Sequence, residues 1–445
     1  MKTTKIIKRW DLAVALFALI FSIFLPGALQ GAAIPSVEDV VTGKAKLPTI
    51  EDLTGGKVKI GDLVDKNNVE LVKEYLTVAM YELVKRGMVL RMGTQLPPEQ
   101  LNPPSFGAAT VRNRGKAVLI GNAPYYEKKG NIWPGGIPFP VAKNGLEAMC
   151  NYHYGRAWDS YHTSPIDLWY VNAKGEHYKT IGQEHIYVKC SGRTVLPPFG
   201  TIPGYENVYI KRISVATYPR EIIGLGQFTV RYYDPGQDYD TGFAYLPAFK
   251  RTIRVSATTW QDNIVGSDIT YGDGDGFQDP FDGWNFKLTG RKFMLVNEPK
   301  SPTPIFDAGG HLSKTVQFDQ GKKYPRLGWV IAPVDVVEAI PKIKHIYGKK
   351  VVYVMMWPYV YTGSGINAVD IYDRQMKLWK GVIHPFGRHE YLNGDPKMPQ
   401  TPLSGSFVYD LQTGHSTQMW MHHMPNVKLD PDKDVNLGIL LKKGR

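Results

Sequence analysis

From about Tyr178 onward, the chain alternates apolar and polar positions in short runs that are separated by turn residues. Alternation with a period of two is typical of strands, and short spacing between such runs favours an antiparallel meander over parallel strands joined by helices. We therefore predict one large, mainly antiparallel β domain with helices packed on it. The runs are HIYVKC, NVYIKRISVATY, FTVRYYD, KRTIRVSA, FKLTGRKFMLV, LGWVIAPVDVVEAI, KVVYVMMWPYVY, SFVYDL and QMWMHHM.

The segment from Asn67 to Arg86 has the spacing of an amphipathic helix. Its apolar residues recur at intervals of three and four, which places them on one helical face. We expect this helix to cover one face of the sheet. The apolar residues are Val69, Val72, Tyr75, Leu76, Ala79, Met80 and Leu83.

The segment from Trp133 to Arg156, WPGGIPFPVAKNGLEAMCNYHYGR, joins a Pro/Gly turn to a short helix. Proline fixes φ and glycine permits backbone angles that other residues avoid, so GGIPFP predicts a defined bend. Asn144 is placed to cap the following helix, in which Leu146, Met149 and Cys150 share a face. A bend of this kind positions a helix and supplies no catalytic chemistry.

The first 33 residues have the pattern of a secretory signal peptide. Four basic residues precede an apolar run from Leu12 to Leu25, and small residues follow at Gly31, Ala32 and Ala33. The run is shorter than the roughly 20 residues that a membrane span needs. An uncleaved anchor is the alternative, because the junction is not a clean Ala-x-Ala. No cysteine lies near the junction, so we expect an exported, unlipidated, soluble periplasmic protein, with association to the outer membrane left open.

Two further segments complete a resemblance to a known family. They are DGFQDPFDGWNFKLTGRKFMLVNEP, from Asp275 to Pro299, and WVIAPVDVVEAIPKIKHIYGKKVVYV, from Trp329 to Val354. With the segment from Trp133 to Arg156, they resemble domain-of-unknown-function family 1329, in the family's order. Its members are often labelled outer membrane lipoprotein-sorting proteins, and the resemblance covers most of the chain after about Lys46.

This resemblance implies a fold similar to that of the lipoprotein carriers LolA and LolB. That fold is α+β and mainly antiparallel, with a strongly curved, half-barrel-like sheet that encloses an apolar cavity and has helices packed on or in it. Residues 34–445 would then form a single LolA/LolB-like domain, with an N-terminal helical part at about 34–160 and a β-meander at about 161–430. The resemblance also implies handover partners, namely an outer-membrane β-barrel and a resistance-nodulation-division exporter.

Bulky aromatic and methionine side chains in or beside the predicted strands are our candidates for lining the cavity. Tyr353, Met355 and Trp357 alternate, so they project from one face. Broad rings and flexible methionines suit an irregular apolar ligand, and the alternative is that they fill an ordinary core. The candidates are Trp260, Trp284, Phe286, Trp329, Tyr353, Met355, Trp357 and Trp379.

The chain is basic. Lysine and arginine number 53 against 41 aspartates and glutamates, a net charge of +12. Residues 1–33 contain four basic residues and one acidic residue, so the remainder carries +9. This surplus favours contact with anionic lipid headgroups or lipopolysaccharide phosphates, and charges scattered for solubility are the alternative. Export argues against nucleic acid as a partner.

Cys150 and Cys190 are the only cysteines. An oxidising periplasm would let them form a disulfide if the fold brings them together. Free, buried cysteines are also common, so both interpretations stay open. Redox catalysis is not expected, because there is no Cys-x-x-Cys spacing.

Metal-ligand patterns are weak in this chain. The run from His389 to Asn393 has asparagine where the zinc motif His-Glu-x-x-His needs its second ligand. Asp273, Asp275 and Asp279 in the glycine-rich acidic loop 268–282 are weak calcium candidates, but a solvated turn is the favoured interpretation. We therefore predict no metal site.

No enzyme motif is present either. The sequence contains no Gly-x-Ser-x-Gly elbow, phosphate loop or dinucleotide fingerprint, so we predict no catalytic residue and no cofactor. We interpret the chain as a non-enzymatic periplasmic carrier or chaperone for a lipid or other hydrophobic ligand, working between the inner and outer membranes. The alternative is an envelope hydrolase or glycan-binding protein that uses the acidic loop 268–282.

Overall fold

The computed structural model describes residues 47–234, 240–255, 260–299, 316–361, 365–387 and 390–444. The chain divides into two units, Met1–Ala33 and Ile34–Arg445, and all the described residues belong to the second. The predicted signal peptide, residues 1–33, lies outside the described residues.

Helices are few and strands are many in the described part of the chain. The α-helices are α3 Ile50–Thr54, α4 Val78–Lys85, α5 Pro104–Asn113, α6 Gly145–Tyr154 and α7 Leu437–Lys443. The strands are β1 Leu63–Val64, β2 Leu90–Met92, β3 Ala117–Ile120, β4 Ala123–Tyr126, β5 Ser160–Val171, β6 His177–Lys189, β7 Val208–Tyr218, β8 Gly226–Tyr232, β9 Thr241–Leu246, β10 Arg251–Val255, β11 Trp284–Asn297, β12 Phe318–Asp319, β13 Tyr324–Pro325, β14 Gly328–Pro341, β15 Lys349–Met355, β16 Ile366–Tyr372, β17 Leu378–Ile383, β18 Glu390–Tyr391, β19 Pro399–Gln400, β20 Gly405–Asp410 and β21 Ser416–Pro425.

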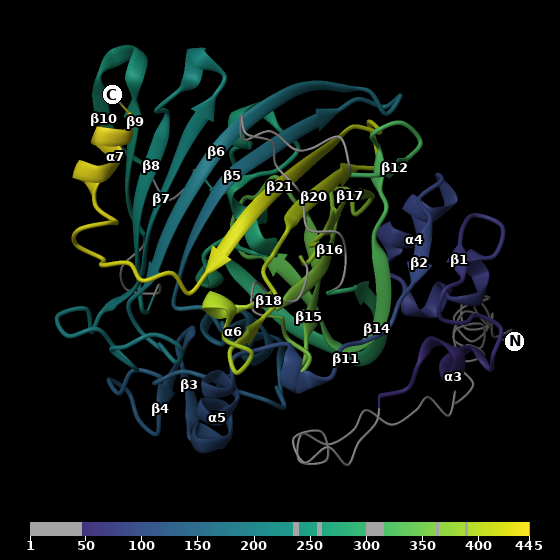
Figure 1. Cartoon of the computed structure of the whole chain (residues 1–445), viewed down its shortest axis with the longest axis horizontal. Helices are drawn as coiled ribbons and strands as arrows, with labels where there is room; N and C mark the ends of the chain where they lie inside the picture. Colours follow the sequence, from purple (N-terminus) through teal and green to yellow (C-terminus); the bar gives the residue numbers. More distant parts are fainter. Residues whose placement is uncertain are drawn as a thin grey trace, which may run out of the picture. The chain divides into compact units, whose positions relative to one another are not determined.

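One large sheet contains fifteen of the described strands. Its order runs β14-β15-β16-β17-β20-β21-β5-β6-β7-β8-β9-β10, with β11 and β2 both paired to β14 and β1 paired to β2. Only the short β2–β14 pairing is parallel. The sheet is therefore built from two meanders, β5 to β10 and β11 to β21, which join where β21 pairs with β5 (Figure 1).

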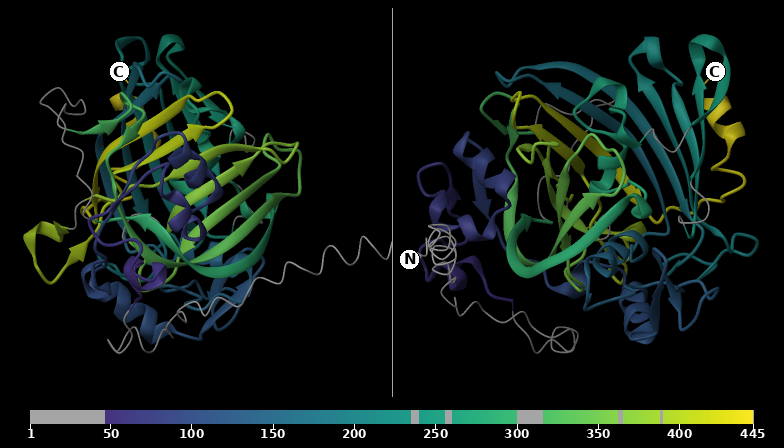
Figure 2. Two further views of the ribbon diagram at one scale, coloured as in Figure 1. Left: turned by 90° about the vertical axis from the view of Figure 1, so that its right-hand side faces the viewer. Right: turned by 180° about the vertical axis from the view of Figure 1, so that it is seen from behind.

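The sheet is curved and stays open. Figures 1 and 2 show the long strands bending around a common interior. Among the described strands, β10 at one end does not pair with β11 at the other. The prediction of a mainly antiparallel, curved, half-barrel-like sheet is therefore confirmed. The strand order is not that of one continuous meander, because β21, the last strand of the second meander, pairs with β5, the first strand of the first meander.

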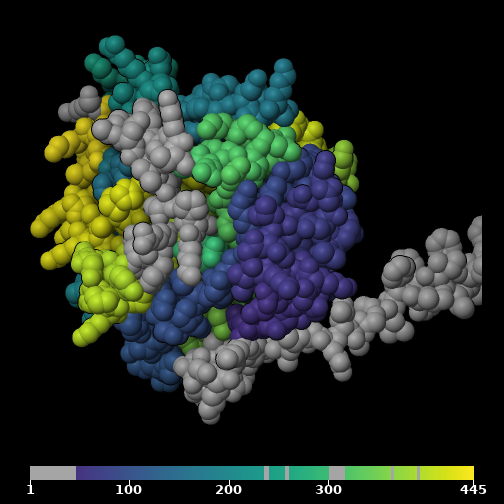
Figure 3. Space-filling view, turned by 45° about the vertical axis from the view of Figure 1, so that its right-hand side comes forward, coloured from purple at the N-terminus to yellow at the C-terminus, as the bar shows by residue number. Residues whose placement is uncertain are grey.

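Side chains alternate between the inner and outer faces of the sheet. On β21, Met419 and Met421 belong to the inner hydrophobic cluster, whereas Trp420 belongs to an outer cluster beneath α4. A second outer cluster lies beneath α7 and contains Ile213, Val215 and other residues of β6 to β9. Figure 3 shows the described N-terminal residues, in purple, covering the part of the surface that includes α4. Both faces of the sheet are thus covered.

The predicted helix from Asn67 to Arg86 is wrong in its first half. Only Val78–Lys85 is α-helical, preceded by two single 3-10 turns. The α-helix begins where the Thr77 hydroxyl accepts a hydrogen bond from the Met80 amide, as in an ordinary N-cap. The amides of Val78 and Ala79 donate to Asp370 of β16 at 2.9 and 3.1 Å, which fastens the start of α4 to the sheet.

The predicted helix after the Pro/Gly bend is confirmed as α6. The Asn144 side chain accepts from the Glu147 amide at 2.9 Å. The first residue of α6 is Gly145, and a Cβ there would lie 2.6 Å from a backbone atom of Phe286 on β11. A glycine is required because the helix approaches the strand this closely. The bend therefore docks α6 directly onto the sheet.

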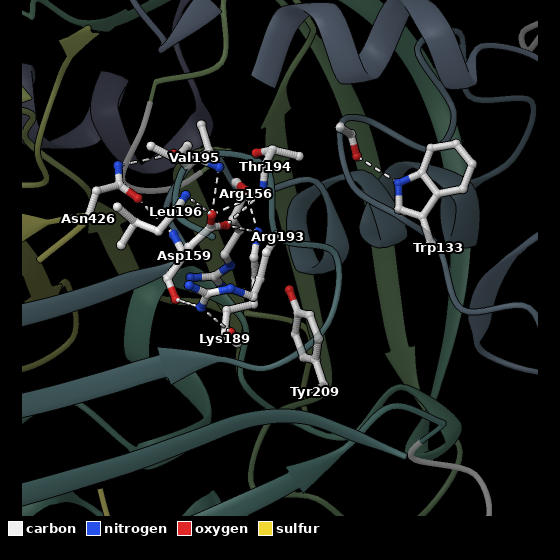
Figure 4. Close-up of polar contacts among 12 residues, drawn as sticks. Trp133, Arg156, Asp159, Lys189, Arg193, Thr194, Val195, Leu196, Tyr209 and Asn426 are labelled. Atoms are coloured by element: carbon white, nitrogen blue, oxygen red, sulfur yellow. Dashed lines mark hydrogen bonds and ion pairs between the residues drawn. The ribbon is translucent and has the colours of Figure 1, made fainter. Parts of the chain in front are cut away.

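A buried polar network holds the chain where α6 leads into β5 (Figure 4). The Asp159 carboxylate accepts from the amides of Thr194, Val195 and Leu196, and it forms an ion pair of 3.1 Å with Lys189. Both side chains of this pair are fully buried. These contacts fix the loop after β6, so we assign the network a structural role.

Candidate functional site

Residues 260–283 cross the inside of the curved sheet from the end of the first meander to the start of the second; we call them the crossing segment. Its Asp268 amide donates to Thr417 of β21 at 2.9 Å. Gln278 accepts from Arg231 of β8 at 3.0 Å, and Asp279 accepts from Lys350 of β15 at 2.7 Å. The segment includes the 3-10 turns Ile264–Gly266, Tyr271–Gly276 and Phe281–Gly283. It therefore bridges strands of both meanders.

Three aspartates of the acidic loop, Asp273, Asp275 and Asp279, are partnered by basic side chains. Lys350 Nζ lies 2.7 Å from Asp279 Oδ2 and 3.1 Å from Asp273 Oδ1, and both lysine and aspartates are buried. Tyr347 donates to Asp273 at 2.6 Å, and Arg156 lies 3.4 Å from Asp275. Within the described part of the chain, no group of three His, Cys, Asp or Glu side chains is placed to hold a metal ion. These carboxylates anchor the crossing segment.

Charge pairing controls the ionisation of this network. Burial by itself would raise the pKa of Asp273, but the ammonium groups of Lys350 and Lys380 outweigh it and hold that pKa at about 2. Burial likewise opposes the charged form of Asp275, but Arg156 and the other positive groups around it together outweigh burial, so this pKa is also lowered. The pKa of Lys350 is raised, because Asp279 and Asp273 outweigh the effect of its burial. The network is therefore ionised at neutral pH.

A cavity of about 430 Å³ lies between the crossing segment and the inner face of the sheet. Its walls come from β5 to β10 and from β20 and β21, as well as from the crossing segment itself. Ile253 of β10 belongs to the wall and is 48% exposed, so the cavity opens beside this edge strand. The cavity is accessible from solvent without unfolding of the sheet.

The cavity has an apolar part and a polar part. The apolar part includes Leu225, Ala244, Leu246, Ile253, Val255, Ile264, Val265, Leu403, Met419 and Met421. The polar part includes Thr163, Gln183, His185, Arg212, Thr229, Ser406 and His423. Burial lowers the pKa of His185 to about 4 and that of His423 to about 3. Both imidazoles are therefore neutral at pH 7.

The sheet register brings most of these polar residues together. Thr163 of β5 pairs with both His423 of β21 and His185 of β6. Arg212 of β7 lies directly opposite Thr229 of β8. His185 pairs with Ser214, two residues from Arg212, so His185 and Arg212 are diagonal neighbours at roughly 7–8 Å between backbones. The polar wall is a patch that spans neighbouring strands.

The eight aromatic and methionine candidates do not line this cavity. Trp284, Tyr353, Met355 and Trp357 are buried in the inner hydrophobic cluster, and Phe286 and Trp379 pack against it. These six side chains therefore lie in an ordinary hydrophobic core, as the alternative interpretation expects.

Trp260 and Trp329 have other surroundings. The guanidinium groups of Arg212 and Arg231 lie over the ring of Trp260, 5.3 and 5.0 Å from the ring centre. Trp329 lies in the outer cluster beneath α4 and borders a second cavity of about 330 Å³, with Leu47 and Tyr359. Trp260 thus contacts the polar wall through Arg212.

Cys150 and Cys190 are both free and buried, so the disulfide interpretation is wrong. Cys150 is part of α6 and belongs to the inner cluster, whereas Cys190 follows β6 and belongs to the outer cluster beneath α7. The Cys150 thiol donates to the Asn122 carbonyl at 3.6 Å. The sheet separates the two thiols, and each occupies a small hydrophobic site.

The sequence did carry a signal for the cavity wall. In β7, Arg212, Ser214 and Ala216 alternate with Ile213 and Val215. An amphipathic strand is ordinarily expected to turn its polar face to bulk solvent. Here the polar face points into the curve, and the apolar face packs beneath α7.

These features define a class of protein in which a curved, open antiparallel sheet and a segment crossing its interior enclose a ligand-sized cavity. The chain belongs to the family described as protein of unknown function (DUF1329), whose model matches residues 63–435. The comparison with curated proteins gave no match. No helix among the described residues has both the length and the apolar character that a membrane span requires.

Three solved structures have a loose likeness to the chain. A domain from Vibrio parahaemolyticus, named as an outer membrane lipoprotein-sorting protein, has 18% identity and a TM-score of 0.39, covering 63% of this chain and 91% of its own. A DUF1329 family protein from Desulfovibrio piger has 15% identity and a TM-score of 0.41, with coverages of 64% and 92%. A LolA superfamily protein from Nitrosomonas europaea has 12% identity and a TM-score of 0.37, with coverages of 67% and 99%.

Proposed function

We propose that this protein is a periplasmic carrier that binds a hydrophobic molecule in the cavity beneath the crossing segment. The observation that carries the proposal is the cavity itself, at about 430 Å³. Sites for small ligands typically measure about 300 to 1,000 Å³ and combine apolar walls with a few polar groups. The wall here has this composition, and an apolar ligand held in it would be shielded from water.

Catalysis is not part of this proposal. The aspartates that would serve a hydrolase are engaged by Lys350 and Arg156. A carboxylate held in a buried ion pair is stabilised in its charged form, and it is poorly placed to exchange protons with a substrate. Handover to an outer-membrane β-barrel and a resistance-nodulation-division exporter, which the family resemblance implies, stays a prediction.

Native purification tests the carrier proposal. The full chain is isolated from its own periplasm without detergent and extracted with organic solvent, and the extract is analysed by mass spectrometry. We expect one dominant hydrophobic compound at close to one molecule per chain. An empty extract, repeated after incubation of the protein with lipids of its own envelope, would overturn the proposal.

A matched pair of variants locates the bound compound. Ala244 lines the cavity on β9, whereas Ala173 is exposed in the turn between β5 and β6. Ala244→Trp should fill the cavity and remove the compound from the extract. Ala173→Trp, the same substitution at the exposed site, should leave the amount unchanged. Equal recovery from both variants would place the compound elsewhere on the protein.

A further inference from the structure

The polar wall of the cavity contains buried donor groups that have no partner in the protein. Among the described residues, no hydrogen bond satisfies His423 Nε2, Thr229 Oγ1 or Ser406 Oγ. These side chains are 7%, 2% and 2% exposed, and all three line the cavity. Leaving a buried polar atom unsatisfied is unfavourable, because the atom loses its hydrogen bonds to water, so such atoms usually have a partner. Thr229 lies directly opposite Arg212 in the register, so these two side chains mark the place of a polar ligand group, whereas Ser406 and His423 lie farther along the same face, on β20 and β21.

Arg212 gives this wall a positive charge. Within the described part of the chain, its guanidinium forms no hydrogen bond and no ion pair, and its close contact is with the ring of Trp260 at 5.3 Å. The neighbouring Arg231 is neutralised by Asp240 at 2.9 Å, and Asp275 is neutralised by Arg156. Asp262 and Arg254 also line the cavity, but both are exposed and of opposite sign. Asp240 and Asp275 also act electrostatically on Arg212, but each has another arginine as its ion-pair partner. Among the described residues of this wall, Arg212 is therefore the buried cationic side chain without an ion pair.

The orientation of His423 suits an oxygen-rich group. Its Nδ1 lies 2.7 Å from the Thr163 hydroxyl. When that hydroxyl donates to Nδ1, the proton of the neutral imidazole is on Nε2, which then acts as a donor toward the cavity. Burial lowers the pKa of His423 to about 3, which keeps the ring in this neutral form. The wall thus presents one guanidinium group and several neutral hydrogen-bond donors.

We propose that the cavity binds a single-chain amphiphile with an anionic headgroup, a carboxylate or a phosphate monoester, whose oxygens are held by Arg212 together with Thr229, which lies directly opposite it on β8. This inference rests on the proposed carrier function and specifies its ligand. The chain of the amphiphile lies along Ala244, Leu246 and Ile253 toward the opening. A volume of about 430 Å³ is near the lower end of the usual range for ligand sites, which suits one chain better than two or three.

A series of ligands with the same chain and different headgroups tests the inference on the wild-type protein. Calorimetric titration of the delipidated full chain compares hexadecanoate, hexadecyl phosphate, hexadecan-1-ol and hexadecyltrimethylammonium. We expect at least one of the two anions to bind at least about 10-fold more tightly than the alcohol, because charged hydrogen bonds contribute more than neutral ones. The cation should bind most weakly of the four. The preferred anion identifies the headgroup as carboxylate or phosphate.

Arg212→Gln tests the residue, and Arg254→Gln is its control. Arg254 also lines the cavity but is exposed. We expect Arg212→Gln to weaken anion binding by about 10- to 100-fold and to leave binding of the alcohol unchanged. Arg254→Gln should change anion affinity by less than about 3-fold. Thermal unfolding followed by circular dichroism confirms that each variant is folded.

The outcomes separate this inference from the carrier function. If the alcohol binds as tightly as both anions and Arg212→Gln has no effect, the anionic headgroup is refuted and the carrier function stands. If none of the four compounds binds to the folded protein and its native extract is empty, the carrier function itself is refuted.

Discussion

Removal of the Lys350 ammonium tests whether buried ion pairs hold the crossing segment in place. Lys350→Met keeps most of the aliphatic stem and leaves Asp273 and Asp279 in the interior without their main counter-charge. Lys350 lies 3.1 and 2.7 Å from these two carboxylates, and all three side chains are at most 3% exposed. Breaking a buried pair by removing one partner typically costs about 3 to 5 kcal/mol.

The pKa of Asp273 supports this magnitude. A carboxyl group held at a pKa of about 2, below its ordinary value, is linked to about 2 kcal/mol of stability at pH 7. The sign follows from the lowered pKa: the contribution is present above the unfolded-state pKa and is lost as the pH falls through about 2. The hydrogen bond to Asp279 adds to it, so about 3 to 5 kcal/mol is expected in total.

Lys349→Met is the matched control for this experiment. Lys349 is the neighbouring residue on β15, and its ion pair with Glu338 at 3.1 Å is partly exposed, at 24% and 27%. Such pairs contribute at most about 1 kcal/mol. Urea unfolding at pH 7, followed by tryptophan fluorescence, gives both free energies of unfolding. The reasoning would be refuted if the two lysine variants had equal stability.

A compensated variant separates charge from packing. Lys350→Met combined with Asp273→Asn and Asp279→Asn replaces the ionic cluster with neutral groups, and this should recover part of the lost free energy of unfolding, since neutral replacement of a buried pair is often tolerated. If the free energy of unfolding does not recover, Lys350 stabilises the fold through its packing and not through its charge.

Three further predictions concern the rest of the fold. Asp159→Asn should destabilise the protein by about 3 to 5 kcal/mol in urea unfolding, because the buried Lys189 loses its counter-charge; wild-type stability would contradict the structural role of this network. Burial raises the pKa of Asp370 to about 6. The protonated carboxyl therefore stabilises the folded state at low pH, and this stabilisation is lost as the pH rises from about 4 to about 6. The stability of the wild type relative to Asp370→Asn should therefore be about 2 kcal/mol greater at pH 4 than at pH 7, and an equal difference at both values would refute the assignment. Cys150 and Cys190 should react with a thiol reagent only after unfolding, since both are buried and burial raises the pKa of each thiol; rapid labelling of the native protein would contradict their placement.

Local sequence patterns predict the elements of this fold better than their arrangement. Alternation in the runs that became β7 and β21 is visible in the sequence, and the Asn144 cap correctly places the start of α6. The pairing of β21 with β5 is invisible locally, since it joins residues about 250 positions apart in the chain. The strand β5 itself contains Pro165 and several polar residues, so its sequence pattern does not resemble a strand.

The cavity illustrates why its lining is harder to predict from sequence than the strands are. Large aromatic residues such as Tyr353 and Trp357 are conspicuous in sequence, but size and apolar character are also what a core requires. The residues that line the cavity are smaller or polar, such as Ser214, Thr229 and Ala244. Their inward orientation depends on the curvature of the sheet and on α7 covering the outer face, and neither is encoded in the strand's own pattern.

Diffraction from the full chain crystallised with a hexadecanoate brominated at its terminal carbon tests the central claim most directly. The account predicts one anomalous bromine peak in the apolar part of the cavity, beside Ala244, Leu246 or Ile253, with density for the carboxylate at Arg212. A bromine peak confined to the outer surface, or a cavity that stays without ligand density at saturating hexadecanoate, would contradict it.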